Sequence, residues 1–189
     1  EIFAEWKASA HARAWKNEPF QKMFLSLGKP EKCVSCHAPE AILFNGPTLI
    51  PKPRKENRED GINCASCHGG PGGFQGPFEA QHIPHPARQD SVFFGIQLCI
   101  SCHGQNGEVH SGMDMRQFNQ VDSFLRTDLI IQGKDCNSCH SPAVQRHSTS
   151  KKDYPIRTTR THQWLGGKDP AFVSNLIRID LKKLPDKIF

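Results

Sequence analysis

The chain has 189 residues, a formal net charge of +5 and 37% hydrophobic residues, which suits one domain or two small lobes that share a core. It contains no run of about 18 apolar residues, so no transmembrane helix is expected. Its basic residues form no long run and Tyr154 is its only tyrosine, so no nucleic-acid-binding face with stacking aromatics is expected.

The first segment, residues 1–16, has the apolar spacing of a helix. Phe3, Trp6 and Ala10 recur on one helical face. His11 lies beside that face among small alanines. Small neighbours would allow a flat, rigid group to approach the helix closely enough for His11 to contact it. The alternative is that His11 is an exposed helical histidine that binds nothing.

Further elements are predicted from apolar spacing and from residues that end helices. In chain order they are a short helix ending near Leu27 with Gly28 after it, a solvated loop over 45–60, a helix over 90–103, an amphipathic helix over 121–132 stopped by Gly133, a polar loop over 148–161, a helix starting at Asp169-Pro170, and a strand-like segment over 177–184. The predicted fold is therefore mainly α, with long loops and little strand.

The pentapeptide C-x-x-C-H occurs four times, and its copies contain all eight cysteines of the chain. The copies are Cys33-Val-Ser-Cys36-His37, Cys64-Ala-Ser-Cys67-His68, Cys99-Ile-Ser-Cys102-His103 and Cys136-Asn-Ser-Cys139-His140. This pattern is the attachment signal of a c-type haem, in which both thiols form thioethers and the adjacent histidine is the proximal iron ligand. Pairs of C-x-x-C also occur in zinc sites, but zinc does not require a histidine after every second cysteine. We therefore expect four haem c groups.

Four haems would change both the charge and the core. Each adds about −1 when ferric and about −2 when ferrous, so the charge falls to about +1 oxidised and about −3 reduced. The excess lysines and arginines then serve as partners of the haem propionates. The low hydrophobic fraction predicts that stacked porphyrins form much of the core of a single domain over residues 1–189, and that the chain without haem is unfolded.

Six histidines lie outside the motifs, and at most four of them can be distal iron ligands within one chain. The favoured candidates are His11, His82, His110 and His162, and the weaker ones are His85 and His147. His82 and His85 lie in a proline-braced loop, whereas His162 lies beside an aromatic residue and a glycine turn. His110 and His147 each follow a motif histidine by seven residues, which is about two helical turns and predicts the same helix face.

Three segments resemble the multihaem cytochromes c of the 554 type. The first two are Trp6-x-x-Ser9-x-His11-Ala12-x-Ala14, which is similar to the family's W-x-x-S-x-H-A-x-A helix, and Gly61-Ile-Asn-Cys64-Ala-Ser-Cys67-His68-Gly69, which is similar to its G-V-x-C-x-x-C-H-G-P-G segment. The third is Cys136-x-x-Cys139-His140-Ser-Pro142 with His162-x-Trp164-x-Gly166, which is similar to its C-x-x-C-H-M-P…H-x-F-x-G ending. In that ending Ser141 stands where the family has methionine.

This resemblance implies a mainly helical, loop-rich fold with stacked haems and with His11, His82 and His162 as distal ligands. Tetrahaem cytochromes that form extracellular filaments have similar sequences, and in those one iron takes a ligand from the neighbouring subunit. The resemblance therefore implies either a soluble carrier or a homopolymer with inter-subunit haem ligation.

We expect the chain to transfer electrons through its haems to redox partner proteins or extracellular electron acceptors, without a catalytic residue. The alternative is a nitrogen-oxide or hydroxylamine oxidoreductase with one five-coordinate haem, for which Tyr154, Arg157 and Arg160 are available. A haem-based gas sensor is less favoured because no output domain is evident. Haem attachment takes place outside the cytoplasm in prokaryotes and the chain opens directly with Glu1-Ile2-Phe3, which suggests a processed protein in the periplasm, at the cell surface or outside the cell.

Overall fold

The computed structural model describes residues 1–79, 87–104, 109–110, 113–114, 119–147 and 154–176. Its helices are α1 (Ile2–Ala8), α2 (Glu18–Ser26), α3 (Glu31–His37), α4 (Ile42–Asn45), the 3-10 turn η1 (Arg58–Asp60), α5 (Cys64–His68), η2 (Ser91–Phe94), α6 (Gln97–His103), α7 (Gln120–Leu125), α8 (Cys136–His140) and α9 (Pro170–Leu176). Its strands are β1 (Gly69–Gly70), β2 (Gly73–Gly76), β3 (Ala87–Gln89), β4 (Val109–His110), β5 (Met113–Asp114), β6 (Ala143–His147) and β7 (Ile156–Arg160).

Short helices provide most of this regular structure, and the described strands form three small open sheets. In the first sheet β1 pairs antiparallel with β2, and β2 pairs parallel with β3. The strands β4 and β5 form a second antiparallel pair, and β6 and β7 form the third. The expectation of a helical, loop-rich fold is thus confirmed in part, because the chain mixes helices with more strand than expected.

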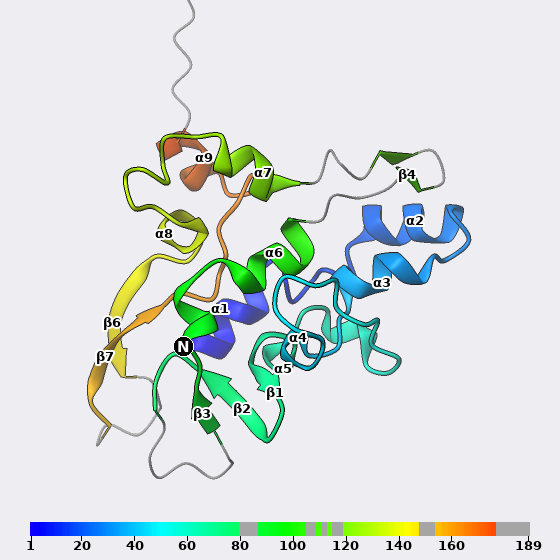
Figure 1. Cartoon of the computed structure of the whole chain (residues 1–189). Coiled ribbons are helices and arrows are strands. Elements are labelled where there is room, and N and C mark those ends of the chain that lie inside the picture. The colour runs from blue at the N-terminus through cyan, green and yellow to red at the C-terminus, as the bar shows by residue number, and fades with distance from the viewer. Residues whose placement is uncertain (80–86, 105–108, 111–112, 115–118, 148–153, 177–189) are drawn as a thin grey trace, which may run out of the picture.

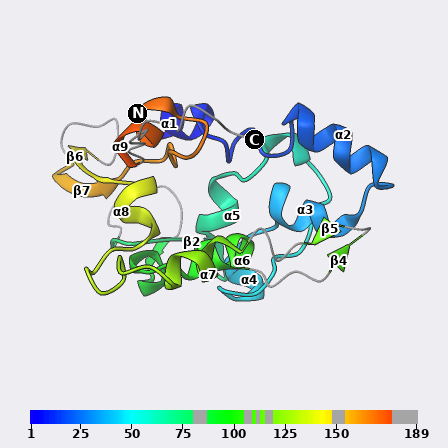
Figure 2. The same cartoon turned by 90° about the horizontal axis from the view of Figure 1, so that it is seen from above.

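The four helices that carry the C-x-x-C-H motifs run across the middle of the molecule. In both views α8 lies toward the β6–β7 hairpin, α5 and α6 are central, and α3 lies toward α2 (Figures 1 and 2). The hairpin and α2 occupy opposite ends (Figures 1 and 2). Motifs that are far apart in the sequence are therefore neighbours in space.

The first predicted helix, over residues 1–16, is much shorter in the structure. The helix α1 ends at Ala8, and Ser9 has an extended backbone with φ −76° and ψ 163°. The Ser9 hydroxyl accepts a hydrogen bond from the backbone N–H of Ala12 at 3.2 Å. This side-chain hydrogen bond replaces a backbone bond of the helix, so the helix does not continue past Ala8. His11 therefore lies in a turn after the helix.

The second and last predicted helices are confirmed. The side chain of Asn17 caps α2, and Gly28 follows the helix with φ +77°, a conformation that glycine adopts without strain. The Asp169 carboxylate accepts a hydrogen bond from the Phe172 N–H at the start of α9. The helix predicted over 90–103 is present as η2 and α6, interrupted at Gly95.

Two other predicted segments differ from the structure. The helix expected over 121–132 is α7, which ends at Leu125 because the Thr127 hydroxyl donates to the Phe124 carbonyl and closes a turn there. The polar loop expected over 148–161 contains the strand β7, whose β-branched residues Ile156, Thr158 and Thr159 favour a strand. The segment 177–184 lies outside the described residues.

The apolar core of the described residues is small. Phe20, Phe24, Val34 and Ala38 form its one buried cluster, with Trp15 packed against it. Many large apolar side chains are exposed, including Phe44, Phe94 and Ile131. Apolar contacts within the polypeptide therefore account for little of the packing.

A buried ion pair connects α1 to the β6–β7 hairpin. The Arg146 side chain is only 4% exposed, and its Nη1 donates to the Glu5 carboxylate at 2.5 Å and to Glu1 at 3.3 Å. Its Nε donates to the Thr159 hydroxyl and its Nη2 to the Arg160 carbonyl. Burial raises the pKa of Glu5, but the bonds from Arg146 and from the His162 backbone outweigh this effect and lower the pKa.

Replacing Arg146 with alanine should lower the free energy of unfolding by about 3–5 kcal/mol, because Glu5 would keep a buried charge without its partner. Denaturant titration of the haem-loaded protein measures this loss. The matched control is Arg126→Ala, which removes a salt bridge to Asp122 whose side chains are 77% and 52% exposed and should cost less than about 1 kcal/mol. Equal losses for the two variants would refute a special role for the buried pair.

Candidate haem-binding centres

Each C-x-x-C-H motif forms the end of a short helix. The helices α3, α5, α6 and α8 all end at the motif histidine. Residues three and four apart share one face of a helix, so both cysteines and the histidine of a motif lie on the same side. This arrangement places two thiols and one imidazole where a single haem would bind all three.

Other segments of the chain hold the motif histidines by their Nδ1 atoms. Nδ1 of His37 lies 2.9 Å from the Ala14 carbonyl, Nδ1 of His68 lies 2.7 Å from the Gln75 carbonyl, and Nδ1 of His140 lies 2.5 Å from the Leu165 carbonyl. Because a carbonyl oxygen only accepts, each Nδ1 carries the proton and donates it. The lone pair is then on Nε2, which is the atom available to a metal.

His103 of the third motif differs from the other three. Its Nδ1 lies 3.3 Å from the side-chain oxygen of Gln120 at the start of α7, whereas the other motif histidines donate to backbone carbonyls. No feature of the sequence indicated this role for Gln120, because the two residues are 17 positions apart.

Aromatic side chains also restrain three of the motif histidines. The ring of Phe20 stacks on His37 with a centroid distance of 3.6 Å and an interplanar angle of 6°. Phe93 stacks on His68 at 4.9 Å and 10°. Phe172 packs against His140 at 5.2 Å and 36°. Each of these imidazoles is therefore held by a hydrogen bond at one edge and by an apolar ring.

The serine before the second cysteine has a structural role in the second and fourth motifs. In α5 the Ser66 hydroxyl accepts from the Asn63 N–H, and the Asn63 side chain accepts from the Ser66 N–H. Asp135 and Ser138 make the same reciprocal pair at α8. These capping boxes allow helices of five residues to form. In the third motif Ser101 accepts instead from the Thr48 N–H.

Two candidate distal histidines face motif histidines from other segments. The ring centroids of His11 and His103 are 6.3 Å apart. Those of His162 and His68 are 6.4 Å apart, with an interplanar angle of 23°. Nδ1 of His162 lies 3.0 Å from the Arg160 carbonyl, so its lone pair is also on Nε2.

His11 is neutral at pH 7. Burial, together with the smaller effects of the neighbouring imidazoles of His103 and His140, lowers its pKa to about 4. Burial also lowers the pKa of His162; among its neighbours, the Arg160 carbonyl and Glu5 raise this pKa, whereas His68 and Arg146 lower it. Neutral imidazole is the form that binds a metal, so both side chains are in the required state.

The turn that carries His11 packs against the segment before the second motif. The His11 carbonyl accepts a hydrogen bond from the Ile62 N–H at 3.0 Å, and the Trp6 indole donates to the Ile62 carbonyl at 2.8 Å. Gly61 has φ +58°, and a Cβ atom there would lie 2.6 Å from the His11 carbonyl oxygen. Glycine is required by this close approach.

Arg54, in the segment predicted as a solvated loop, makes hydrogen bonds to the backbone around Gly61. Its Nη2 donates to the Gly61 carbonyl at 2.8 Å and to the Asn57 carbonyl at 2.9 Å. Its Nη1 reaches the Pro39 carbonyl at 3.4 Å. The loop therefore has an anchor that its charged composition did not indicate.

The prediction that His110 and His147 lie on the helices of their motifs is wrong. The helices α6 and α8 end at the motif histidines, and the two residues lie on β4 and β6. His147 is exposed, and its Nδ1 lies 2.6 Å from the Tyr154 carbonyl. His82 and His85 lie outside the described residues.

Thiols of different motifs are in contact. Cys36 and Cys102 share a hydrogen bond, which lowers the pKa of Cys36 and raises that of Cys102. Cys99 and Cys136 share another, which raises the pKa of Cys99. The third motif thus touches both the first and the fourth through its haem-attachment residues.

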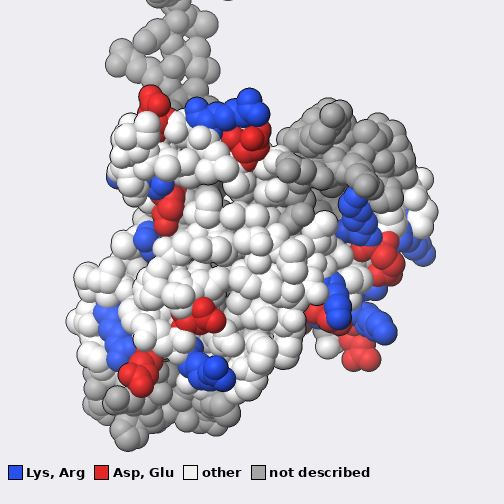
Figure 3. Space-filling view, viewed as in Figure 1, with Lys and Arg blue, Asp and Glu red and all other residues white. Residues whose placement is uncertain are grey.

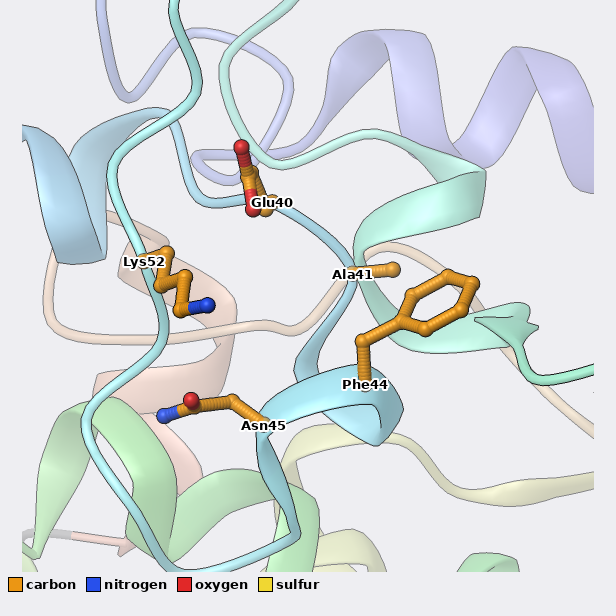
Figure 4. Close-up of a pocket in the computed structure, with 5 residues that line it drawn as sticks. All are labelled: Glu40, Ala41, Phe44, Asn45 and Lys52. Atoms are coloured by element: carbon orange, nitrogen blue, oxygen red, sulfur yellow. The ribbon is translucent and has the colours of Figure 1, made fainter.

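Within the described ranges, no group of three or more His, Cys, Asp and Glu side chains is arranged to hold a metal ion directly. No helix in the same ranges is long and apolar enough to span a membrane. A small pocket of about 40 Å³ lies beside α4, lined by Glu40, Ala41, Phe44, Asn45 and Lys52 (Figure 4). It contains no motif residue and is smaller than usual ligand pockets of about 300–1,000 Å³.

Comparison with known proteins found one family. The model of the family described as cytochrome c554 and c-prime matches residues 1–69, which contain His11 and the first two motifs. This match supports a c-type cytochrome that transfers electrons through haem c. Comparison with curated proteins and with solved structures found no match. The third resembling segment, from Cys136 to Gly166, lies beyond the matched residues.

Replacing Asp135 with alanine should lower the free energy of unfolding by about 1 kcal/mol, because α8 would lose its capping box. Asp135→Asn is the matched control, since Asn63 makes the same pair of bonds at α5. Denaturant unfolding of the haem-loaded variants measures both effects. If the asparagine variant is as destabilised as the alanine variant, the carboxylate charge matters and the cap does not.

Proposed function

We propose that this chain transfers electrons through four covalently bound haem c groups, one at each motif helix, with two histidine ligands on each iron. Haem supplies one-electron transfer between ferric and ferrous iron. The observation that carries the proposal is the pair of histidine spacings, 6.3 Å for His11 with His103 and 6.4 Å for His162 with His68.

These spacings fit two imidazoles that share one metal. If two imidazoles bound one metal from opposite sides with metal–nitrogen distances of about 2.0 Å, their ring centres would be about 6.3 Å apart. Both observed distances agree with this value. We therefore assign His11 as the distal ligand of the third motif and His162 as that of the second.

The residues around the motifs would hold each haem in three ways. The eight motif cysteines would form the thioethers, the four motif histidines would bind through Nε2, and the Nδ1 acceptors would orient the rings. The exposed apolar side chains would pack against porphyrin surfaces, which agrees with the small core of the polypeptide. The thiol contacts between motifs favour haems that lie against one another and form the core of one domain over residues 1–189.

His110 and His82 are the proposed distal ligands of the other two irons. The strand β4, which contains His110, lies with β5 at the same end of the molecule as α2 and α3 in both views (Figures 1 and 2). This position favours His110 for the haem of the first motif. His82 is then assigned to the fourth motif.

The surface charge favours protein partners over nucleic acid. On the face shown in Figure 3, basic and acidic side chains are interspersed and the middle carries few charges. With four haems the net charge is about +1 to −3. We propose a location outside the cytoplasm, with redox proteins or extracellular electron acceptors as partners.

A polymer is the second form that this carrier can take. His147 is exposed, and its Nδ1 is held by the Tyr154 carbonyl, so Nε2 is the atom that it presents to a metal. Six histidines outside the motifs exceed the four distal positions of one chain. We propose that in the polymer one of the four in-chain distal ligands is replaced by a surplus histidine from a neighbouring subunit.

Carbon monoxide binding tests the electron-transfer function. The ferrous wild-type protein, with four haems confirmed by mass spectrometry, should show no rapid Soret shift because every iron has two histidine ligands. The variants His11→Ala and His162→Ala should each show a rapid shift that corresponds to one haem. His147→Ala is the control and should behave as the wild type in dilute solution.

Two results would count against the proposal. A haem content below four per chain would remove its basis. Rapid carbon monoxide binding by one haem of the wild-type protein would favour the oxidoreductase alternative, in which one iron has an open position for substrate.

Electron microscopy of material purified from cells tests the polymer. Filaments are expected in negative stain for the wild type, and they should be lost in His147→Ala if this residue is the shared ligand. Monodisperse particles at high protein concentration would contradict the polymer and support the soluble carrier.

A further inference from the structure

The segment 160–165 contains one of the proposed iron ligands and contacts two others. His162 belongs to this segment, and Trp164 packs against His11. The Leu165 carbonyl accepts a hydrogen bond from Nδ1 of His140, and the Leu165 N–H donates to the His140 carbonyl. A stretch of six residues thus reaches histidines assigned to three different haems.

The Trp164 ring packs against both distal histidines. Its ring centroid is 4.7 Å from that of His11, with an interplanar angle of 61°, and 5.1 Å from that of His162, with an angle of 75°. Both contacts are edge-to-face, an arrangement in which aromatic rings attract each other and resist rotation. One indole therefore restrains the planes of two imidazoles.

The backbone at Trp164 is strained. Its φ is +45°, in the left-handed region that favours glycine and is unfavourable for a large side chain. Gly166 and Gly167 follow two and three residues later, so residues that would adopt this conformation easily are close by. A bulky residue at such a position indicates that the side chain itself is needed.

We propose that Trp164 is a positioning residue that orients the distal ligands of two haem irons at once, those of the second and third motifs. This inference rests on the proposed ligation of those irons by His162 and His11. It predicts that one substitution at residue 164 opens two haems, and that the haems of the first and fourth motifs keep their ligands.

The test is the number of haems per chain that bind carbon monoxide rapidly in the ferrous state. The number should rise from none in the wild type to two in Trp164→Ala, and Trp164→Phe should restore it to none because a ring remains. Trp164→Gly relieves the backbone strain, yet it should also give two. The control Phe3→Ala removes an aromatic ring that is 63% exposed on α1 and should give none.

Combined variants identify which haems open. The double variant His11→Ala/His162→Ala should give two rapidly binding haems. Adding Trp164→Ala should give no more than two, because the same irons are already open. A count above two in the triple variant would show that Trp164 acts on other haems and would overturn the inference.

Other outcomes also decide the matter. If Trp164→Ala and Trp164→Gly both keep four closed haems, or if glycine behaves as phenylalanine does, the role of Trp164 is structural only and the inference is wrong. Failure of the proposed function is told apart from failure of this inference by the wild-type protein. If the wild type has fewer than four haems or one open haem, the proposed function is wrong whatever the variants at residue 164 show.

Discussion

The hydrogen bond at Nδ1 of each motif histidine is the interaction on which the rest of the arrangement depends. It decides which nitrogen carries the proton and therefore which one can bind iron. Because every motif helix ends at its histidine, the acceptor always comes from elsewhere in the chain: Ala14, Gln75, Gln120 and Leu165. The cysteines of a motif are placed by one turn of helix, but its imidazole is oriented only when the tertiary structure has formed.

That tertiary structure is held by few apolar contacts. In the part of the chain that the structure describes, the one buried cluster surrounds Phe20 and Phe24 at the first motif. Elsewhere, polar groups connect distant segments, such as Arg146 with Glu5 and Arg54 with the Gly61 carbonyl. Such bonds specify geometry but contribute modest net stability. A chain of this kind needs covalently attached apolar groups to complete its interior, which is the physical reason to expect stability to depend on the haems.

Sequence reasoning succeeded where the signal is local. The end of α2 at Gly28 and the start of α9 at Asp169 follow from capping chemistry within a few residues. Sequence reasoning failed where a distant partner or a single side chain determines where a helix ends. Ser9 ends α1 early, and the helix expected to continue to His147 stops at His140. For the site, the motifs indicated attachment residues, but no local pattern relates Gln120 to His103 or Glu5 to the His162 N–H.

The connections among the motifs favour a conductor of electrons over a catalyst. The third motif touches the first and the fourth through its thiols, and its histidine faces His11. Catalysis at iron requires an open coordination position with proton donors beside it. Here two motif histidines each face a second imidazole at the distance that a shared iron would set. Trp164 packs on both of these second imidazoles, so the structure restrains the groups that would have to leave for a substrate to bind.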